Sequence, residues 1–530
     1  MKLGILLIPV IALAILAVPM SAADSDTEFE EITFTEGLFT FQTINDVRVA
    51  AVSYDNDHAE EVVEIPAEVE HDGVTYIVTD LVCSFNNDRI IGVKIPEHVW
   101  NIPNPGLIKE GKNIDAFIVH DDNFNLMSDN GILFDKKMSQ LIAYPKAYET
   151  VSYGIPTTVT IIGESAFEGC NNLIYVDTYI DGLAEIKARA FYGCENLQYV
   201  NNIADMNTLP ETVSIIDDEA FKDCPKLCTF KLPDNIKIIG ADAFNGTPIT
   251  TVNIPAKTVY IGEGAFGNCS QLETIVSDYN GKYTVEDNVL FEVGKDSKTL
   301  FTYPAGKKGA EYTIDDEVTS IADMAFAGTK YLKKVKLPDE AMMIPSGSFA
   351  DCTSLEEIDL SRIVLIDVSA FWNCINLNTV KFSNGLTTIN PYAFENCGFE
   401  EIELPSSVTY IGIYAFSDCK NLKKVTIPDY TAAEVYTNVF QGCSSLTEID
   451  LLSSDIVLNE GALNVAVGKE QTVDIVKPKG YSIPSDAVTD ELTVLSVHDL
   501  GERPYPYENL IGVAICLLIL YMIFRLFRKV

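Results

Sequence analysis

The stretch IIGESAFEGCNNL, residues 161–173, decides the fold because close copies of it recur along the chain. Related segments read IIDDEAFKDCPKL from Ile215, YIGEGAFGNCSQL from Tyr260 and YIGIYAFSDCKNL from Tyr410. In each of them a small residue precedes a phenylalanine, and a cysteine follows three residues later. Self-similarity of this kind is the signature of a repeat architecture.

Eleven units are found when the copies are aligned on the phenylalanine. Most are 22 to 24 residues apart, and two gaps are longer, at 30 and 60 residues. Isoleucine lies five positions before the phenylalanine in ten units, alanine directly precedes it in nine, and leucine follows six positions later in nine. The aligned residues are Phe167, Phe191, Phe221, Phe244, Phe266, Phe326, Phe349, Phe371, Phe394, Phe416 and Phe440. A period near 23 predicts a solenoid whose coils stack and share one core.

Each unit also contains a short segment of alternating apolar residues, such as LKKVTIP at 422–428. The alternation predicts a strand with every second side chain pointing inward, and the proline ends it because it has no N–H to donate. A second extended segment, such as SSVTYIG at 406–412, leads into the phenylalanine turn. We therefore predict a curved, mainly β repeat solenoid with short turns and 3-10 segments, on the order of 50 Å long if coils are about 4.8 Å apart.

The long gap before Phe326 contains a duplicated segment. DNVLFEVGKDSKTLFTYP at 287–304 matches DNGILFDKKMSQLIAYP at 129–145, ahead of Phe167. In both copies a charged turn separates two apolar runs, so we predict a β-hairpin inserted twice, within about 117–152 and 275–314. Such projections could carry specificity.

The flanks differ from the repeats. Residues 24–77 alternate apolar and polar positions and are expected to form an N-terminal β cap, because a solenoid must cover its open end. The solenoid is predicted to span 78–451, with 83–96 as a degenerate first coil. Residues 452–500 are expected to form a small β cap or stalk, and 501–509 a stiff linker.

Both ends of the chain suggest export and anchoring. Residues 1–23 combine a basic start, an apolar stretch and small residues before Ala23, which is typical of a signal peptide; an uncleaved N-terminal anchor is the alternative. Residues 510–527 are predicted to form a single transmembrane helix, with Arg525 snorkelling. The basic residues at its far end favour a cytoplasmic tail at 528–530, so the rest of the protein is expected outside the cell.

The repeat unit resembles that of the BspA-like leucine-rich repeat family, also described as the Treponema-type repeat. It reads Ile-Gly-x-x-Ala-Phe-x-x-Cys-x-x-Leu-x-x-Val-x-Ile-Pro. The resemblance covers about 78–451 and is specific because the motif recurs at one period. It implies a leucine-rich-repeat array on a cell surface, and several family members are adhesins. No ligand-binding residue can be carried over, and the chain has no LPxTG-type sorting motif ahead of its tail.

The charge balance excludes one class of partner. The chain has 77 acidic and 37 basic residues, a formal net charge of −40. Nucleic-acid binding needs cationic residues facing phosphates, so a nucleic-acid partner is not expected. The acidic residues are spread along the chain, which indicates a solvated surface.

The recurring cysteines could bind a metal, form disulfides or pack in the core. Nine lie three residues after an aligned phenylalanine: Cys170, Cys194, Cys224, Cys269, Cys352, Cys374, Cys397, Cys419 and Cys443. One cysteine per coil makes a line and not a cluster, which argues against a metal site. Disulfides between coils would need a torsion that parallel side chains disfavour, so we predict a reduced, buried ladder, with threonine accepted at Thr247 and Thr329.

No motif in the chain indicates catalysis. The five histidines form no zinc or nucleophile motif, and no glycine-rich phosphate loop is present. Acidic segments such as HDDNFN at 120–125 lack the spacing of calcium loops and are interpreted as solvated turns. The triplets at Asn245 and Asn268 are N-glycosylation sequons. We expect no enzyme activity, metal or cofactor.

The predicted function is adhesion. We expect a membrane-anchored surface protein that binds an extracellular protein or glycan by multi-point contact along the solenoid. Trp372, Tyr392 and Tyr414 are candidate anchors, with packing against the next coil as the alternative. The alternative function is structural, as a self-associating envelope component without a foreign ligand.

Overall fold

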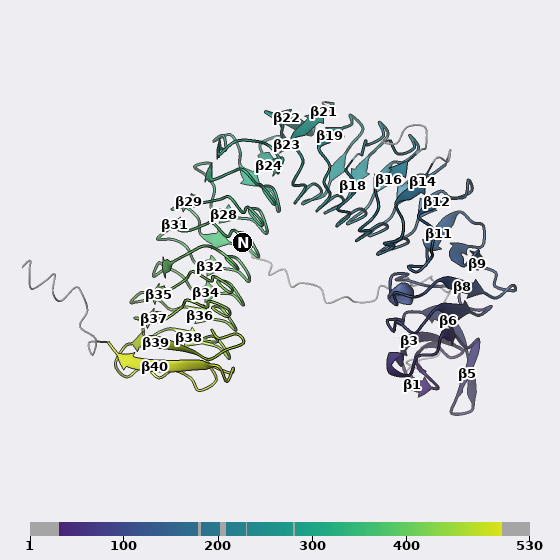
Figure 1. Cartoon of the computed structure of the whole chain (residues 1–530), viewed down its shortest axis with the longest axis horizontal. Coiled ribbons are helices and arrows are strands. Elements are labelled where there is room, and N and C mark those ends of the chain that lie inside the picture. Colours follow the sequence, from purple (N-terminus) through teal and green to yellow (C-terminus); the bar gives the residue numbers. More distant parts are fainter. Residues whose placement is uncertain (1–30, 179–181, 202–207, 229, 279–280, 501–530) are drawn as a thin grey trace, which may run out of the picture.

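The computed structural model describes residues 31–178, 182–201, 208–228, 230–278 and 281–500. Within them the chain forms strands β1 to β40 and two 3-10 helices, η1 (Asn56–His58) and η2 (Leu107–Lys109). Figure 1 shows successive coils stacked along a curved arc. The protein is therefore a mainly β solenoid.

Each coil contributes a two-residue strand that ends five positions before the phenylalanine, at isoleucine in ten units and at Val435 in the last. These strands pair in parallel with isoleucine opposite isoleucine, as for Ile162 and Ile186. One sheet contains β9 (Leu126–Asp129), β10 (Ile132–Asp135), β11 (Gln140–Ala143), β13 (Ile161–Ile162), β15 (Glu185–Ile186), β17 (Ile215–Ile216), β18 (Ile238–Ile239) and β20 (Tyr260–Ile261). A second sheet contains β28 (Met343–Ile344), β30 (Leu365–Ile366), β32 (Thr388–Ile389), β34 (Tyr410–Ile411), β36 (Glu434–Val435) and β38 (Val457–Leu458).

A longer strand follows the turn in most coils. These strands pair in parallel with their counterparts in neighbouring coils and form sheets of their own. Their alternating apolar residues point into the core. They are β12 (Ser152–Gly154), β14 (Tyr175–Asp177), β16 (Tyr199–Asn201), β19 (Thr251–Ile254), β21 (Thr274–Ser277), β25 (Glu311–Thr313), β27 (Lys334–Lys336), β29 (Glu357–Leu360), β31 (Thr379–Phe382), β33 (Glu401–Glu403), β35 (Lys424–Ile427) and β37 (Glu448–Leu451). In Figure 1, β29, β31, β35 and β37 lie on the outer side of the arc, and β32, β34, β36 and β38 lie nearer its inner side.

Three-stranded antiparallel units occupy both copies of the duplicated segment. The first is β9–β10–β11, and the second is β22 (Tyr283–Glu286), β23 (Val289–Val293) and β24 (Lys298–Thr302). Each continues into the solenoid, since Leu141 pairs with Ile162 and Leu300 of β24 pairs with Ile321 of β26 (Ser320–Ile321). Strand β10 separates two cores, because Ile132 and Phe134 face the solenoid core while Leu133 faces the N-terminal core.

The aligned phenylalanines form two stacks in the core. Neighbouring rings within each stack lie 4.9 to 6.1 Å apart between centroids, with interplanar angles of 2° to 17°. Tyr144 and Tyr303, from the Tyr-Pro ends of the duplicated segment, begin the two stacks on Phe167 and Phe326. Each fully buried ring contributes roughly 1.5–3 kcal/mol of transfer free energy.

The N-terminal region has its own core and two sheets. The larger sheet has the order β1 (Thr33–Glu36), β2 (Phe39–Asn45), β3 (Arg48–Tyr54), β6 (Val74–Leu81) and β5 (Glu68–His71). The smaller sheet is parallel, with the order β4 (Val62–Glu64), β7 (Gly92–Ile95) and β8 (Ala116–Val119).

Coil stacking extends beyond Leu451, where the sequence predicted that the solenoid ends. Strand β38 pairs with β36, and buried Leu463 takes the place of the phenylalanine. The longer strands β39 (Gln471–Lys477) and β40 (Thr493–Asp499) then continue the outer sheet from β37. The prediction missed this coil because leucine replaces the aromatic residue that defined the alignment.

The predicted signal peptide at 1–23 and transmembrane helix at 510–527 lie outside the described residues. Among the residues that are described, none belongs to a helix that is long and apolar enough to cross a bilayer.

Candidate interaction surface

The turn around each aligned phenylalanine has the same backbone in every coil. The residues two before and two after the phenylalanine have φ between 53° and 80° in all eleven units. We call the succession of these turns the turn ridge; it lies on the inner side of the arc (Figure 1). The residue two positions after the phenylalanine is always glycine, asparagine or aspartate, which adopt left-handed conformations at the lowest cost. This sequence signal was available and would have located a residue of positive φ in each turn.

The position two before the phenylalanine is less restricted despite the same φ. It includes Arg189, Glu219, Met324, Tyr392 and Tyr414. A residue with a bulky side chain in this region costs about 1–2 kcal/mol. Interactions along the ridge therefore must offset that cost.

In the first coils the offset is electrostatic. Arg189 bridges Glu168 at 2.7 Å and Glu219 at 2.6 Å, and Lys222 bridges Glu219 and Asp242 at 2.8 Å each. Burial raises the pKa of Glu168 and Glu219, but hydrogen bonds from the cations outweigh it and leave both pKa values below their usual range. We call these five residues the charged ridge.

In three later coils the ridge is apolar. Its exposed residues, 37% to 46% accessible, are Val368, Trp372, Ile375, Tyr392 and Ile413. Tyr414 is half-buried, and its ring stacks on Tyr392 with centroids 5.3 Å apart. The coils are consecutive, and the N–H of Tyr392 donates to the carbonyl of Ile413. We call these six residues the aromatic ridge patch. It contains all three predicted anchors, Trp372, Tyr392 and Tyr414. Trp372 and Tyr392 are exposed as expected of binding residues, and Tyr392 and Tyr414 also pack against each other between neighbouring coils.

Sequence reasoning missed the two most exposed aromatic residues in the part of the chain that the structure describes. Tyr430 is 85% exposed with φ of 63°, in the loop after β35, and Phe124 is 82% exposed in the loop between β8 and β9. Buried Asn123 fixes the second loop by donating to the carbonyls of Pro96 and Val99 at 2.8 Å. A single aromatic residue in a polar loop carries no periodic signal, so the alignment could not reveal it.

The cysteine ladder runs through the buried side of the turns. In eight coils the thiol lies 3.0 to 3.2 Å from the phenylalanine carbonyl of the preceding coil and donates to it. Cys170 makes the equivalent contact with the carbonyl of Tyr144 at 3.6 Å. Thr329 fits the same position and donates to the sulfur of Cys352 at 3.0 Å.

This burial makes the ladder thiols poor nucleophiles. It raises the pKa of Cys170 and of Cys269 to about 12. Of the close pair Cys224 and Cys228, the first is buried in the ladder and the second is exposed. No group of three or more metal-ligating side chains is found in the part of the chain that the structure describes.

The two sequons lie in the turn ridge. Asn245 is 4% exposed, and its amide donates to Asp242 at 2.9 Å. Asn268 is half-buried and donates to Asn245 at 3.2 Å. A glycan attached to Asn245 would have to replace these contacts, so the folded coil argues against its modification.

Comparison with known proteins identifies the repeat. A family model described as the BspA type leucine-rich repeat region, in six copies, matches residues 143–273, 201–293, 305–402 and 387–467, together more than half of the chain. That model describes a structural repeat and indicates no catalytic activity. A comparison with curated proteins finds no significant match.

Among solved structures, a leucine-rich cell surface protein from Faecalibacterium prausnitzii is 25% identical, with a TM-score of 0.45, over 84% of this chain and 100% of that one. A leucine-rich repeat protein from Eubacterium ventriosum is 22% identical, with a TM-score of 0.45, over 64% and 86%. The pneumococcal vaccine antigen PcpA is 16% identical, with a TM-score of 0.37, over 89% and 99%. On the extent of the family-model match, the chain belongs to the BspA-type leucine-rich repeat family.

Proposed function

We propose that the protein is a cell-surface adhesion protein that binds an extracellular partner protein through the aromatic ridge patch. The observation that carries the proposal is the contiguity of Trp372, Tyr392 and Ile413 on one exposed ridge of a strongly acidic protein. Exposed apolar clusters mark interaction sites, and tryptophan and tyrosine dominate binding hot spots.

The solenoid supports this role by holding the patch rigid. The Phe349, Phe371, Phe394 and Phe416 rings stack directly beneath it, with centroids 5.1 to 5.3 Å apart. A preorganised surface loses little conformational freedom on binding. Family membership agrees with a surface role in protein–protein interaction.

Export and anchoring form part of the same proposal. They rest on the signal-like segment at 1–23 and the apolar segment at 510–527. We further propose that the N-terminal sheets and the strands after β38 cover the open ends of the solenoid, because an uncovered coil would expose its core.

The test is a binding screen of the whole chain against extracellular-matrix proteins, glycans and neighbouring cells. Two variants should weaken binding roughly tenfold or more without unfolding, since aromatic anchors contribute about 2 kcal/mol or more. They are Trp372→Ala and Tyr392→Ser, which introduce the residues that Ala350 and Ser369 already supply at the same ridge positions.

Tyr331→Asn is the matched control, because Tyr331 is 45% exposed but lies in a different coil, and Asn172 occupies its position in another unit. It should leave binding unchanged. If no foreign ligand binds while the chain assembles with itself, the structural role replaces adhesion.

A further inference from the structure

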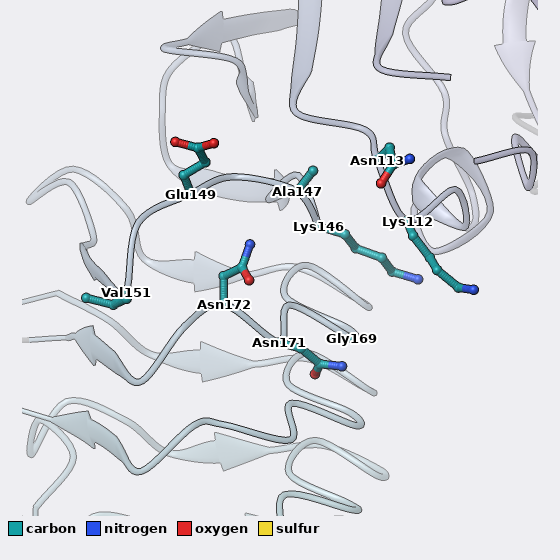
Figure 2. Close-up of a pocket in the computed structure, with 9 residues that line it drawn as sticks. All are labelled: Lys112, Asn113, Lys146, Ala147, Glu149, Val151, Gly169, Asn171 and Asn172. Carbon is teal, nitrogen blue, oxygen red and sulfur yellow. The ribbon is translucent and has the colours of Figure 1, made fainter. Parts of the chain in front are cut away.

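A polar pocket lies where the N-terminal region meets the first solenoid coil. Its volume is about 620 Å³, within the range of small-molecule sites. Lys112 and Asn113 line it from the N-terminal side, and Lys146, Asn171 and Asn172 line it from the solenoid side (Figure 2). It is separated along the arc from the aromatic ridge patch, so it does not depend on the adhesion proposal.

Two cations face this pocket in a protein of net charge −40. Figure 2 shows the side chains of Lys112 and Lys146 extending side by side in the same direction. Lys146 has no carboxylate within 4 Å among the residues that the structure describes, and Lys112 has only Asp88, at 3.7 Å. The lining also includes Glu149, but in Figure 2 its carboxylate points away from the two lysines. The two ammonium groups therefore remain largely unneutralised by the chain itself.

The amide side chains are oriented by hydrogen bonds outside the pocket. Asn171 accepts at Oδ1 from the N–H of Glu195, at 2.9 Å, so its Nδ2 donors remain for a ligand beside the lysines. Asn172 donates at 3.1 Å to the carbonyl of Tyr148, and Asn113 donates at 2.6 Å to that of Asp88. Their Oδ1 atoms are left as acceptors. The site thus combines donors for an anion with fixed acceptors for hydroxyl groups.

The duplicated segment provides an internal comparison. The second copy of this segment makes a corresponding junction with the coil of Phe326. There, Ser270 and Ala305 occupy the positions that Lys112 and Lys146 occupy at the first junction. The two junctions share a backbone hydrogen bond, since the N–H of Ala147 donates to the carbonyl of Ile114 at the first and the N–H of Gly306 donates to the carbonyl of Leu272 at the second. The fold therefore does not need the two lysines, and their presence at one junction requires another reason.

We propose that this pocket binds a saccharide residue that carries a carboxylate. The two ammonium groups and the Asn171 amide would hold the carboxylate, since charge-assisted hydrogen bonds are the strong ones. The oxygens of Asn113 and Asn172 would accept from ring hydroxyls. A bare anion would leave those acceptors unused, and none of the described residues that line the pocket has an aromatic side chain for an apolar ligand.

The experiment is calorimetric titration of the whole chain with glucuronate and N-acetylneuraminate, with glucose, acetate and phosphate as comparisons. Both acidic sugars should bind, with an affinity that falls as the salt concentration rises. The affinity for glucose should be lower by a factor of roughly ten or more. Lys112→Ser and Lys146→Ala should each reduce acidic-sugar affinity roughly tenfold. Both introduce residues that the second junction already carries.

Lys330→Asn is the matched control, because it exchanges a lysine of the second junction for the residue found at Asn171. It should leave the affinity unchanged. Equal binding of glucose, equal binding of acetate or phosphate, the absence of binding, or unaltered affinity in the lysine variants would each overturn the proposal. None of these outcomes bears on the aromatic ridge patch.

Discussion

The ammonium nitrogen of Lys109 lies 3.9 Å from the sulfur of Cys170, the first member of the cysteine ladder. It also donates to the carbonyl of Ala166 at 3.0 Å. Lys109 belongs to η2 in the N-terminal region, and its side chain is fully buried. The contact spans 61 residues of sequence and joins the two hydrophobic cores through the side-chain nitrogen of a buried lysine.

Replacing Lys109 by methionine should stabilise the protein near neutral pH, by roughly 1–3 kcal/mol, because an apolar side chain of similar length removes a buried charge. The carbonyl of Ala166 keeps a partner, since the N–H of Tyr144 also donates to it at 2.8 Å. The free energy of unfolding in urea measures the effect. Lys112→Met, in an exposed side chain nearby, should have little effect, and clear destabilisation by Lys109→Met would show that the ammonium group contributes net stability.

The same substitution should change the pH dependence of stability. Burial lowers the pKa of Lys109 below its usual value of 10.5, although the neighbouring Cys170 opposes the shift. Between the folded and unfolded pKa values the unfolded chain binds more protons, so the stability of the native protein rises with pH in that window. The advantage of Lys109→Met should therefore decrease as pH rises toward 10.5. A constant difference across this range would contradict the lowered pKa of Lys109.

The ladder position should accept threonine but not leucine. Cys374→Thr should change stability by about 1 kcal/mol or less, because Thr247 and Thr329 already occupy equivalent buried positions. Cys374→Leu should destabilise by about 1–3 kcal/mol, because the turn has no room for the extra volume. Urea denaturation of the two variants distinguishes a packing role from a chemical one, and equal losses would argue against packing.

Alkylation of the native chain should be confined by burial. Cys228 should react with iodoacetamide at neutral pH before any ladder cysteine, because it is exposed whereas the ladder thiols are buried, and burial raises the pKa of Cys170 and of Cys269. Peptide mapping by mass spectrometry assigns the reacted residues one by one. Urea should abolish the difference, and rapid labelling of Cys170 in the native protein would contradict the buried ladder.

The sequence predicted the coil because the coil depends on periodic residues. Phenylalanine, isoleucine and leucine at fixed spacing are enough to predict the shared core and its parallel strands. The side-chain contacts along the turn ridge could not be predicted in the same way. Pairs such as Arg189 with Glu219, or Tyr392 with Tyr414, depend on which side chains the stacking brings together, and the residues involved differ from coil to coil. The contact of Lys109 with Cys170 links a non-repetitive segment to the repeats and has no sequence signal.

The charged ridge allows a direct test of how such contacts support the solenoid. Arg189→Gln should remove both ion pairs and leave Glu168 and Glu219 facing each other across the coils. Because the Arg189 side chain is 36% exposed, solvent screens part of the interaction, and we expect a loss of about 1–2 kcal/mol at pH 7. Lys423→Gln, in an exposed pair with Glu400, should have a much smaller effect.

The pH dependence decides whether the loss is electrostatic. The pKa values of Glu168 and Glu219 lie below their usual value of 4.5, so the stability that they contribute is complete above that value and is lost as pH falls through the folded pKa values. The unfolding free energies of the native protein and of Arg189→Gln should therefore converge as the pH falls through the folded pKa values, below 4.5. Hydrogen exchange should show faster opening of the coils at Phe167, Phe191 and Phe221, because repeat stability is a sum of neighbouring interfaces. A difference that persists at low pH would instead mean that Arg189 acts through packing on Tyr192, whose ring lies 3.9 Å from the guanidinium carbon.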